Sequence, residues 1–84
     1  MYNLLIINNM KKLLKTLAKE LEFTQEIEYF DYCIDSHING NFSQCRELFN
    51  AMRKEDKKAF INYLNGQAQF NGKLEVRNFY FNLL

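Results

Sequence analysis

The side chains best suited to metal chemistry lie close together near the middle of the chain. Cys33 and His37 are four residues apart, a spacing that presents two ligands on one face of a helix, and Cys45 follows soon after. A closed zinc site needs four ligands, and with two cysteines and one histidine in the chain the fourth would have to be a carboxylate. Both cysteines also fall among apolar residues at helical spacing, where free cysteine commonly behaves as a small buried side chain. We therefore predict no metal site and no cofactor.

His37 is also the residue best suited to act as a general base near neutral pH. Catalysis by histidine needs an orienting partner and a nucleophile or bound substrate, and the sequence has no second histidine and no serine-containing nucleophile elbow. It also lacks a glycine-rich phosphate loop and a dinucleotide-binding fingerprint. We predict that the protein is not an enzyme, and that His37 is a partly buried residue in the last turn of a helix, where its protonated form is favoured.

Acidic side chains share one face of the helix expected before Gly40, namely Glu28, Asp31 and Asp35. Carboxylates bind Mg²⁺ or Ca²⁺ when they converge, but helical spacing spreads these three along a face. A solvated face, or one that opposes the lysines of a neighbouring helix, is the ordinary outcome of such a pattern. An acidic face can also dock a basic surface, so these residues are candidate contacts with a protein partner.

A cationic cluster lies in the second half of the chain and consists of Arg53, Lys54, Lys57 and Lys58. If residues 42–64 form two short helices, their outline resembles a helix-turn-helix element. The turn lacks the usual glycine, and Glu55 and Asp56 would face the phosphates unfavourably at the start of the second helix. Nucleic-acid binding through this cluster is therefore the alternative function, and nucleic acid is not the partner that we favour.

The C-terminal sequence NFYFNLL places apolar side chains all around its segment, more than one core-facing stripe of a helix can hide. Either the tail packs into the core or its aromatic residues contact a partner, which includes a second copy of the chain in a homodimer. The candidate contacts in this tail are Phe79, Tyr80 and Phe81.

Two amphipathic helices are predicted in the first half of the chain. From Ile6 to Leu21 apolar residues recur at helical spacing, opposite a face of four lysines, Lys11, Lys12, Lys15 and Lys19. A second stripe runs from Ile27 to Ile38, with Thr24 expected as the N-cap. An antiparallel pair of these helices would oppose the lysines and the acidic face, although each exposed ion pair contributes only about 0 to 1 kcal/mol.

The Asn-Gly pair at 39–40 would signal a β-hairpin between alternating apolar residues, but the apolar spacing on both sides is three and four. We therefore predict a helix corner, in which Gly40 adopts the left-handed conformation and Asn41 with Gln44 caps the next helix. Residues 42–64 form one long helix or two with a break near Lys54. We favour two, because Glu55 and the following aspartate suit a helix N-terminus, and we expect Asn65-Gly66 to end the second.

The C-terminal segment has two possible structures. Asn71-Gly72 with alternating apolar residues around it indicates a β-hairpin, whereas Val76, Phe79, Tyr80 and Leu83 keep helical spacing. An isolated hairpin is only marginally stable in water. We therefore favour a final helix from about Lys73.

The whole chain, residues 1–84, is expected to form a single all-α domain, a small bundle of four or five helices with the aromatic residues of 42–64 at its centre. A domain of this length buries only about 60% of the surface that its unfolded chain exposes, so its stability must come from dense apolar packing. No apolar run approaches the ~18 to 20 residues that span a membrane. Two cysteines do not make a disulfide scaffold, so we expect a cytoplasmic protein with reduced thiols.

The net charge of +1 argues against a strongly electrostatic partner such as bulk nucleic acid or an anionic membrane surface. Lysine, asparagine, isoleucine, phenylalanine and tyrosine, whose codons are A/T-rich, are abundant, and proline and tryptophan are absent. An A/T-rich bacterium, its phage or another mobile element is the source that this composition indicates. We therefore expect a non-enzymatic protein–protein interaction module, in its concrete version a phage- or mobile-element-encoded inhibitor or adaptor of a host protein.

Overall fold

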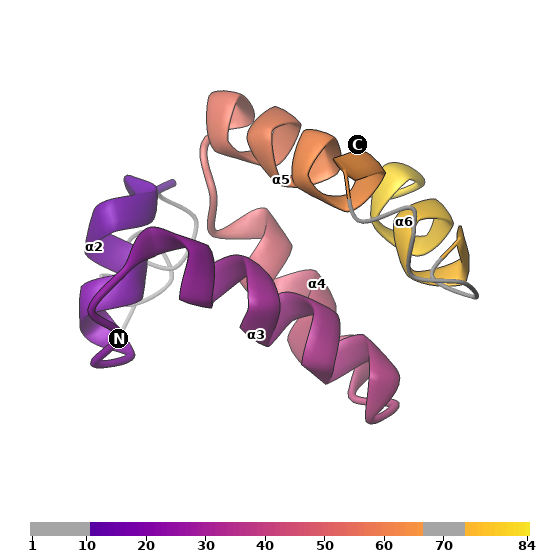
Figure 1. The fold of residues 1–84 in the computed structure, drawn as a ribbon, viewed down its shortest axis with the longest axis horizontal. Helices are drawn as coiled ribbons and strands as arrows, with labels where there is room; N and C mark the ends of the chain where they lie inside the picture. Colours follow the sequence, from indigo (N-terminus) through magenta and orange to yellow (C-terminus); the bar gives the residue numbers. More distant parts are fainter. Residues whose placement is uncertain (1–10, 67–73) are drawn as a thin grey trace, which may run out of the picture.

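The structure is a computed structural model that describes residues 11–66 and 74–84, and these residues form five α-helices. The helices are α2 (Leu14–Glu20), α3 (Glu26–Ile38), α4 (Phe42–Asn50), α5 (Lys54–Gly66) and α6 (Leu74–Phe81) (Figure 1). The predicted all-α class with four or five helices is confirmed. Within the two described ranges, no helix is both long and apolar enough to cross a membrane.

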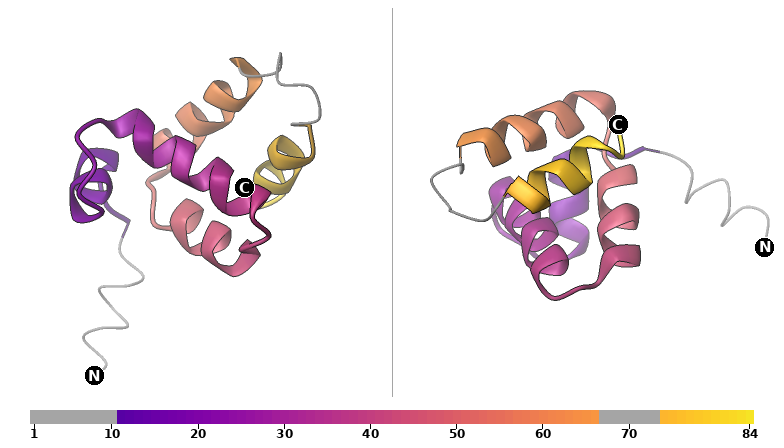
Figure 2. Two further views of the ribbon diagram at one scale, coloured as in Figure 1. Left: turned by 60° about the horizontal axis from the view of Figure 1, so that its bottom comes forward. Right: turned by 90° about the vertical axis from the view of Figure 1, so that its right-hand side faces the viewer.

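Helix α3 contacts most of the other helices. α2 packs against its N-terminal half, α4 runs beside it, and α6 lies toward its C-terminal end, with α5 packed on α6 (Figures 1 and 2). The predicted antiparallel pairing of the first two helices is not seen, because α2 runs across the N-terminal end of α3 and not alongside it (Figure 1). Among the described residues, no ion pair joins the lysines of α2 to the acidic face of α3, and Lys12 instead contacts Glu20 at 2.6 Å.

The first described helix starts later than its apolar pattern predicts. Residues 11–13 are not helical, and residues 1–10, where the predicted helix begins, lie outside the described part of the chain. The cause is a long-range contact: the Lys12 N–H donates to the carbonyl of Ala51 at 3.0 Å, in a parallel bridge with Met52. The N-terminus of α2 is completed by another helix, since the Asp56 carboxylate of α5 accepts the Leu14 N–H at 3.1 Å. Leu13 lies just before α2 and Leu21 just after it. Both belong to the stripe that was predicted to be buried, and both are exposed.

Helix α3 begins one residue later than predicted, with Gln25 and not Thr24 at the N-cap. The Glu28 carboxylate accepts the Gln25 N–H at 2.9 Å and the Thr24 N–H at 2.9 Å, so an acidic side chain satisfies donors at the positive end of the helix. The predicted apolar stripe is buried only in its middle. Phe30, Cys33 and Ile34 are buried, whereas the end residues Ile27 and Ile38 are exposed.

The predicted corner between α3 and α4 is confirmed, with φ +79° at Gly40. The Gly40 N–H donates to the His37 carbonyl at 3.0 Å and the Asn41 N–H donates to the Ser36 carbonyl at 2.9 Å, which is the Schellman pattern of helix ends. Asn41 is the N-cap residue of α4, as predicted, but its side chain makes no capping hydrogen bond, so the predicted capping interaction is absent. The Gln44 amide faces α3 instead, where it donates to the Tyr32 hydroxyl at 2.6 Å.

The favoured break near Lys54 is also confirmed. Residues 51–53 separate α4 from α5. In this segment the Met52 side chain is fully buried and the Ala51 carbonyl accepts the Lys12 N–H. Glu55 and Asp56 lie in the first turn of α5, where the helix dipole favours carboxylates. At its C-terminal end α5 extends to Gly66, so the predicted end at Asn65-Gly66 agrees with the structure.

The C-terminal segment is helical from Leu74, as favoured. The hairpin alternative is wrong, because a hairpin turning at Asn71-Gly72 needs an extended strand where α6 lies. The turn sequence itself falls in residues 67–73, outside the described residues.

Aromatic rings from four helices form the centre of the core. The ring centroid of Phe60 (α5) lies 5.1 Å from that of Phe30 (α3), 5.9 Å from that of Phe49 (α4) and 4.8 Å from that of Tyr80 (α6). The hydroxyl groups of buried tyrosines are also satisfied, since Tyr80 donates to the Cys33 carbonyl at 2.6 Å and Tyr29 to the Leu48 carbonyl at 2.7 Å. Of the aromatic residues of 42–64, Phe49 and Phe60 occupy the centre, as predicted, whereas Phe42 is exposed and Tyr63 is half-buried.

Candidate functional site

The two cysteines lie in the core. Cys33 and Cys45 are free thiols with no exposed surface, and the Cys45 thiol lies 4.0 Å from the Cys33 carbonyl oxygen. Burial raises the pKa of the Cys33 thiol well above its ordinary value, so the thiolate form that binds metals and reacts as a nucleophile is suppressed. Within residues 11–66 and 74–84, no three cysteine, histidine or acidic side chains come together as a metal site.

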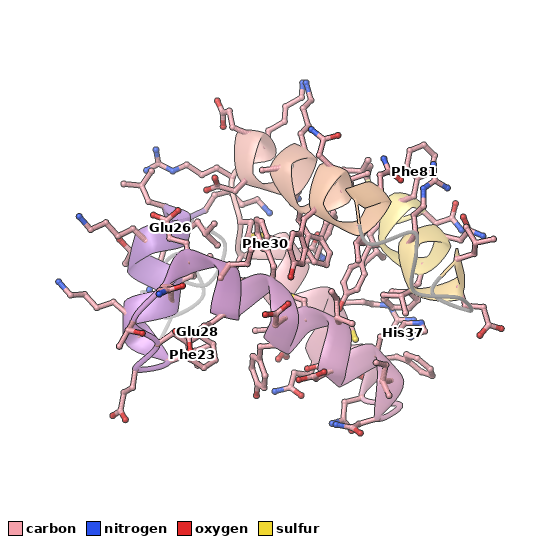
Figure 3. All side chains as sticks on the ribbon, in the orientation of Figure 1. Phe23, Glu26, Glu28, Phe30, His37 and Phe81 are labelled. Carbon is pink, nitrogen blue, oxygen red and sulfur yellow. The ribbon has the colours of Figure 1, made fainter. Side chains whose placement is uncertain are left out.

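His37 lies in an aromatic environment between α3, α4 and α6 (Figure 3). Its ring centroid is 5.1 Å from that of Phe42 and 5.0 Å from that of Phe79, both in edge-to-face geometry. Burial among these rings lowers the pKa of His37, and the nearby carboxylate of Glu75 opposes that shift only in part. The neutral imidazole is therefore favoured here, contrary to the expectation that the helix end favours the protonated form.

This lowered pKa predicts a pH dependence of stability. In the unfolded chain His37 binds a proton more readily than in the folded protein, so stability is highest above the unfolded pKa of 6.5 and falls as the pH drops below it. Urea unfolding of the wild type should therefore show a lower midpoint at about pH 5.5 than at about pH 7.5. In His37→Gln this part of the pH dependence should disappear. An equal decrease in both proteins would assign the effect to other groups.

The predicted acidic face is exposed or half-exposed, but its three carboxylates have different environments. Glu28 is used at the N-terminus of α3, where hydrogen bonds from Gln25 and Thr24 lower its pKa. Asp31 accepts a hydrogen bond from the Tyr63 hydroxyl of α5 at 2.6 Å, which raises the pKa of Tyr63 to about 12. Asp35 is exposed one turn further along. Two of these three candidate partner-binding residues, Glu28 and Asp31, therefore already accept hydrogen bonds from other residues of the protein.

The aromatic tail is divided among three environments. Tyr80 is completely buried and belongs to the core, so it is removed from the predicted contact surface. Phe79 is half-buried beside His37, with the Arg46 guanidinium 5.6 Å from its ring centroid. Phe81 is 49% exposed, and the Arg77 guanidinium lies 5.4 Å from its ring centroid.

The cationic cluster lies at the start of α5. Arg53, Lys54 and Lys58 are exposed, whereas Lys57 is half-buried with its ammonium group 5.2 Å from the ring centroid of Phe49. Burial lowers the pKa of Lys57, and the adjacent ammonium group of Lys11 lowers it further. The structure thus adds Lys11 to the predicted cluster. The sequence did not indicate this, because Lys11 is far from Lys57 along the chain.

A surface cluster that the sequence reasoning did not identify lies where the end of α3, the start of α4 and α6 meet. We call it the aromatic corner. It consists of His37, Phe42, Arg46 and Phe79, which contact one another, together with Ile38, which follows His37 in the sequence. Ile38 is 53% exposed and Phe42 is 43% exposed, and the ring centroids of Phe42 and Phe79 are 5.6 Å apart. Phe42 and Ile38 both fall in predicted apolar stripes, so the pattern alone assigned them to the core.

A second surface feature is a shallow groove of about 230 Å³ between α2, α3 and α4. We call it the acidic groove. Its lining consists of Leu17, Glu20, Leu21, Tyr29, Tyr32, Gln44, Glu47, Leu48 and Ala51. No sequence motif marks it, because its walls come from three separate segments of the chain.

Comparison of the chain with models of protein families, with characterised proteins and with solved structures gives no match.

Proposed function

We propose that the protein is a non-enzymatic protein-binding module and that the aromatic corner is its main contact surface. The observation that carries this proposal is the exposure of Phe42 beside the half-buried Phe79. Aromatic residues and arginine are enriched at protein interfaces, where a few large side chains supply most of the binding energy. The corner combines both kinds of residue, because Arg46 packs on Phe79.

The corner is a better candidate than the acidic face of α3. Glu28 and Asp31 already form hydrogen bonds within the protein, so a partner would have to compete for them. Exposed ion pairs also contribute little free energy, about 0 to 1 kcal/mol each. We retain Asp35 as a contact that influences the orientation of the partner, while burial of the corner residues supplies most of the affinity.

The concrete version of the proposal is an inhibitor or adaptor of a host protein, encoded by a phage or another mobile element and acting in the cytoplasm. The composition of the chain supports the origin, through its abundant residues with A/T-rich codons. The buried free cysteines support a reducing compartment.

Exchange of Phe42 for serine should reduce partner binding about tenfold or more, as expected when a large interface side chain is removed. The test is quantitative capture of proteins from a lysate of the source cell by the immobilised wild type and by Phe42→Ser, followed by titration of the captured partner. Phe81→Ser is the matched control, because Phe81 is similarly exposed but lies outside the corner. Equal affinities of the wild type and Phe42→Ser would contradict the assignment of the corner.

Self-association is the other use of an exposed apolar surface, and the proposed homodimer is tested on the same variants. Light scattering on the size-exclusion peak should give either the monomer mass of 10.1 kDa or twice that value. A dimer that becomes a monomer in Phe42→Ser would mean that the partner of the corner is a second copy of the chain.

The second candidate function is nucleic-acid binding through the cationic cluster. The observation in its favour is the approach of Lys11 to Lys57, which adds a fifth cation to Arg53, Lys54, Lys57 and Lys58. A salt-dependent mobility shift of duplex DNA, lost in a Lys54→Glu/Lys58→Glu variant, would support it, since both side chains are exposed. No binding at low salt would exclude it.

A further inference from the structure

The acidic groove is separate from the aromatic corner. α2 forms one wall and lies at the opposite end of α3 from α6, which carries part of the corner (Figure 1). Its apolar lining combines the buried Leu17 and Tyr29 with the half-buried Leu48 and with Leu21, which is 39% exposed. Leu21 and Leu48 are thus the apolar side chains that a partner can reach at this second place.

The size of the groove limits what can bind in it. Pockets that enclose drug-sized molecules have volumes of about 300 to 1,000 Å³, and this groove is smaller and open on one side. A single large apolar side chain is an occupant of suitable size. Such an anchor residue in a pocket is a common element of protein interfaces.

The charges around the groove determine the chemistry of that occupant. Its lining residues include two carboxylates, Glu20 and Glu47, and no lysine or arginine. Lys12 pairs with Glu20, which leaves the charge of Glu47 unbalanced by any ion pair in the described residues. Glu28 and Asp35 lie four residues before and three residues after the lining residue Tyr32, so further negative charge follows the same side of α3.

We propose that the acidic groove binds a basic segment of a protein partner that inserts one large apolar side chain, with lysine or arginine on both sides of it. The apolar anchor contacts Leu21 and Leu48. One flanking cation lies near Glu47, and the other lies near Glu20, where it competes with Lys12. This proposal rests on the proposed function only in taking the partner to be a protein, and it uses a different surface.

The test uses short synthetic peptides and amide chemical-shift mapping of the full chain, a method that detects weak binding and locates it. The probe is Lys-Arg-Leu-Arg-Lys, and two matched peptides replace the central leucine by glycine or all four basic residues by glutamate. We expect the leucine peptide to shift the amides of Tyr32, Leu48 and Ala51. Its affinity should exceed that of the glycine peptide about tenfold, because one apolar side chain is buried. The glutamate peptide should not bind.

Two variants locate the contact further. Glu47→Lys and Leu21→Ser should each weaken binding of the leucine peptide several-fold. Both should remain folded, since Leu21 is partly exposed and Glu47 lies in the last turn of α4, where a cation is favoured. Glu75→Lys, the same charge change beside the corner, is the control and should bind like the wild type.

The proposal is overturned if the leucine and glycine peptides bind equally, if Glu47→Lys binds like the wild type, or if the shifted amides lie at the corner. The first two results leave the proposed function of the corner untouched, because that function is tested by Phe42→Ser. Shifted amides at the corner would overturn the groove and leave the corner as the binding surface.

Discussion

Replacement of Phe60 by alanine is expected to lower the free energy of unfolding by about 3 to 5 kcal/mol. Phe60 is fully buried, and its ring contacts aromatic rings of α3, α4 and α6. Its removal would leave a cavity bounded by Phe30, Phe49 and Tyr80, three rigid rings from three helices. Because rings held by separate helices cannot easily close such a cavity, the loss should fall at the upper end of that range.

The consequence for a chain of 84 residues is severe. Stabilities of about 0.05 to 0.15 kcal/mol per residue are usual, so one such truncation removes a large part of the total. Urea unfolding followed by circular dichroism measures the change. Phe81→Ala is the matched control: it removes the same side chain at a half-exposed position and should cost far less. If the two variants lose similar stability, Phe60 is not the centre of the core.

The features predicted correctly from the sequence depend on local chemistry. A glycine that follows the last turn of α3 is compatible with the left-handed conformation whatever lies around it, so the corner at Gly40 could be recognised. Likewise, Glu55 and Asp56 favour a helix N-terminus through the dipole of their own helix. Neither prediction required knowledge of tertiary contacts.

The start of α2 was predicted wrongly for the opposite reason. Apolar spacing continues through Leu13, but the Lys12 N–H is bound by Ala51, nearly forty residues away. The hydrogen bond from Leu14 to Asp56 is of the same kind, since a carboxylate of α5 completes the end of α2. Contacts of this kind override a helical pattern, and nothing in the local sequence indicates them.

The candidate sites show the same division. Helical spacing gives the angle between Phe79, Tyr80 and Phe81, but only packing decides which of them faces the core, and that residue is Tyr80. The aromatic corner joins Phe42 to Phe79. Such a cluster can be predicted only after the positions of α4 and α6 are known.

Exchange of Gly40 for alanine is expected to lower the free energy of unfolding by about 1 to 2 kcal/mol, the cost of placing a side chain in the left-handed conformation. An added Cβ would meet no atom within 4 Å, so the whole effect comes from the backbone at φ +79°. Gly40→Asn should lose less, because asparagine tolerates this conformation. Thermal unfolding of the three proteins should give the order glycine, asparagine, alanine.

Gly66 provides the matched control at the end of α5. It lies in the helix without a left-handed φ, and an added Cβ there also meets no atom within 4 Å. Gly66→Ala should therefore leave stability unchanged or raise it by up to about 1 kcal/mol, since alanine favours the helix. The same substitution thus has opposite effects at two glycines that both follow an asparagine. A loss at Gly66 equal to the loss at Gly40 would mean that backbone conformation is not the cause. A loss at Gly40 alone would show that the left-handed backbone between α3 and α4, one residue before the N-cap of the helix that carries Phe42, is the cause.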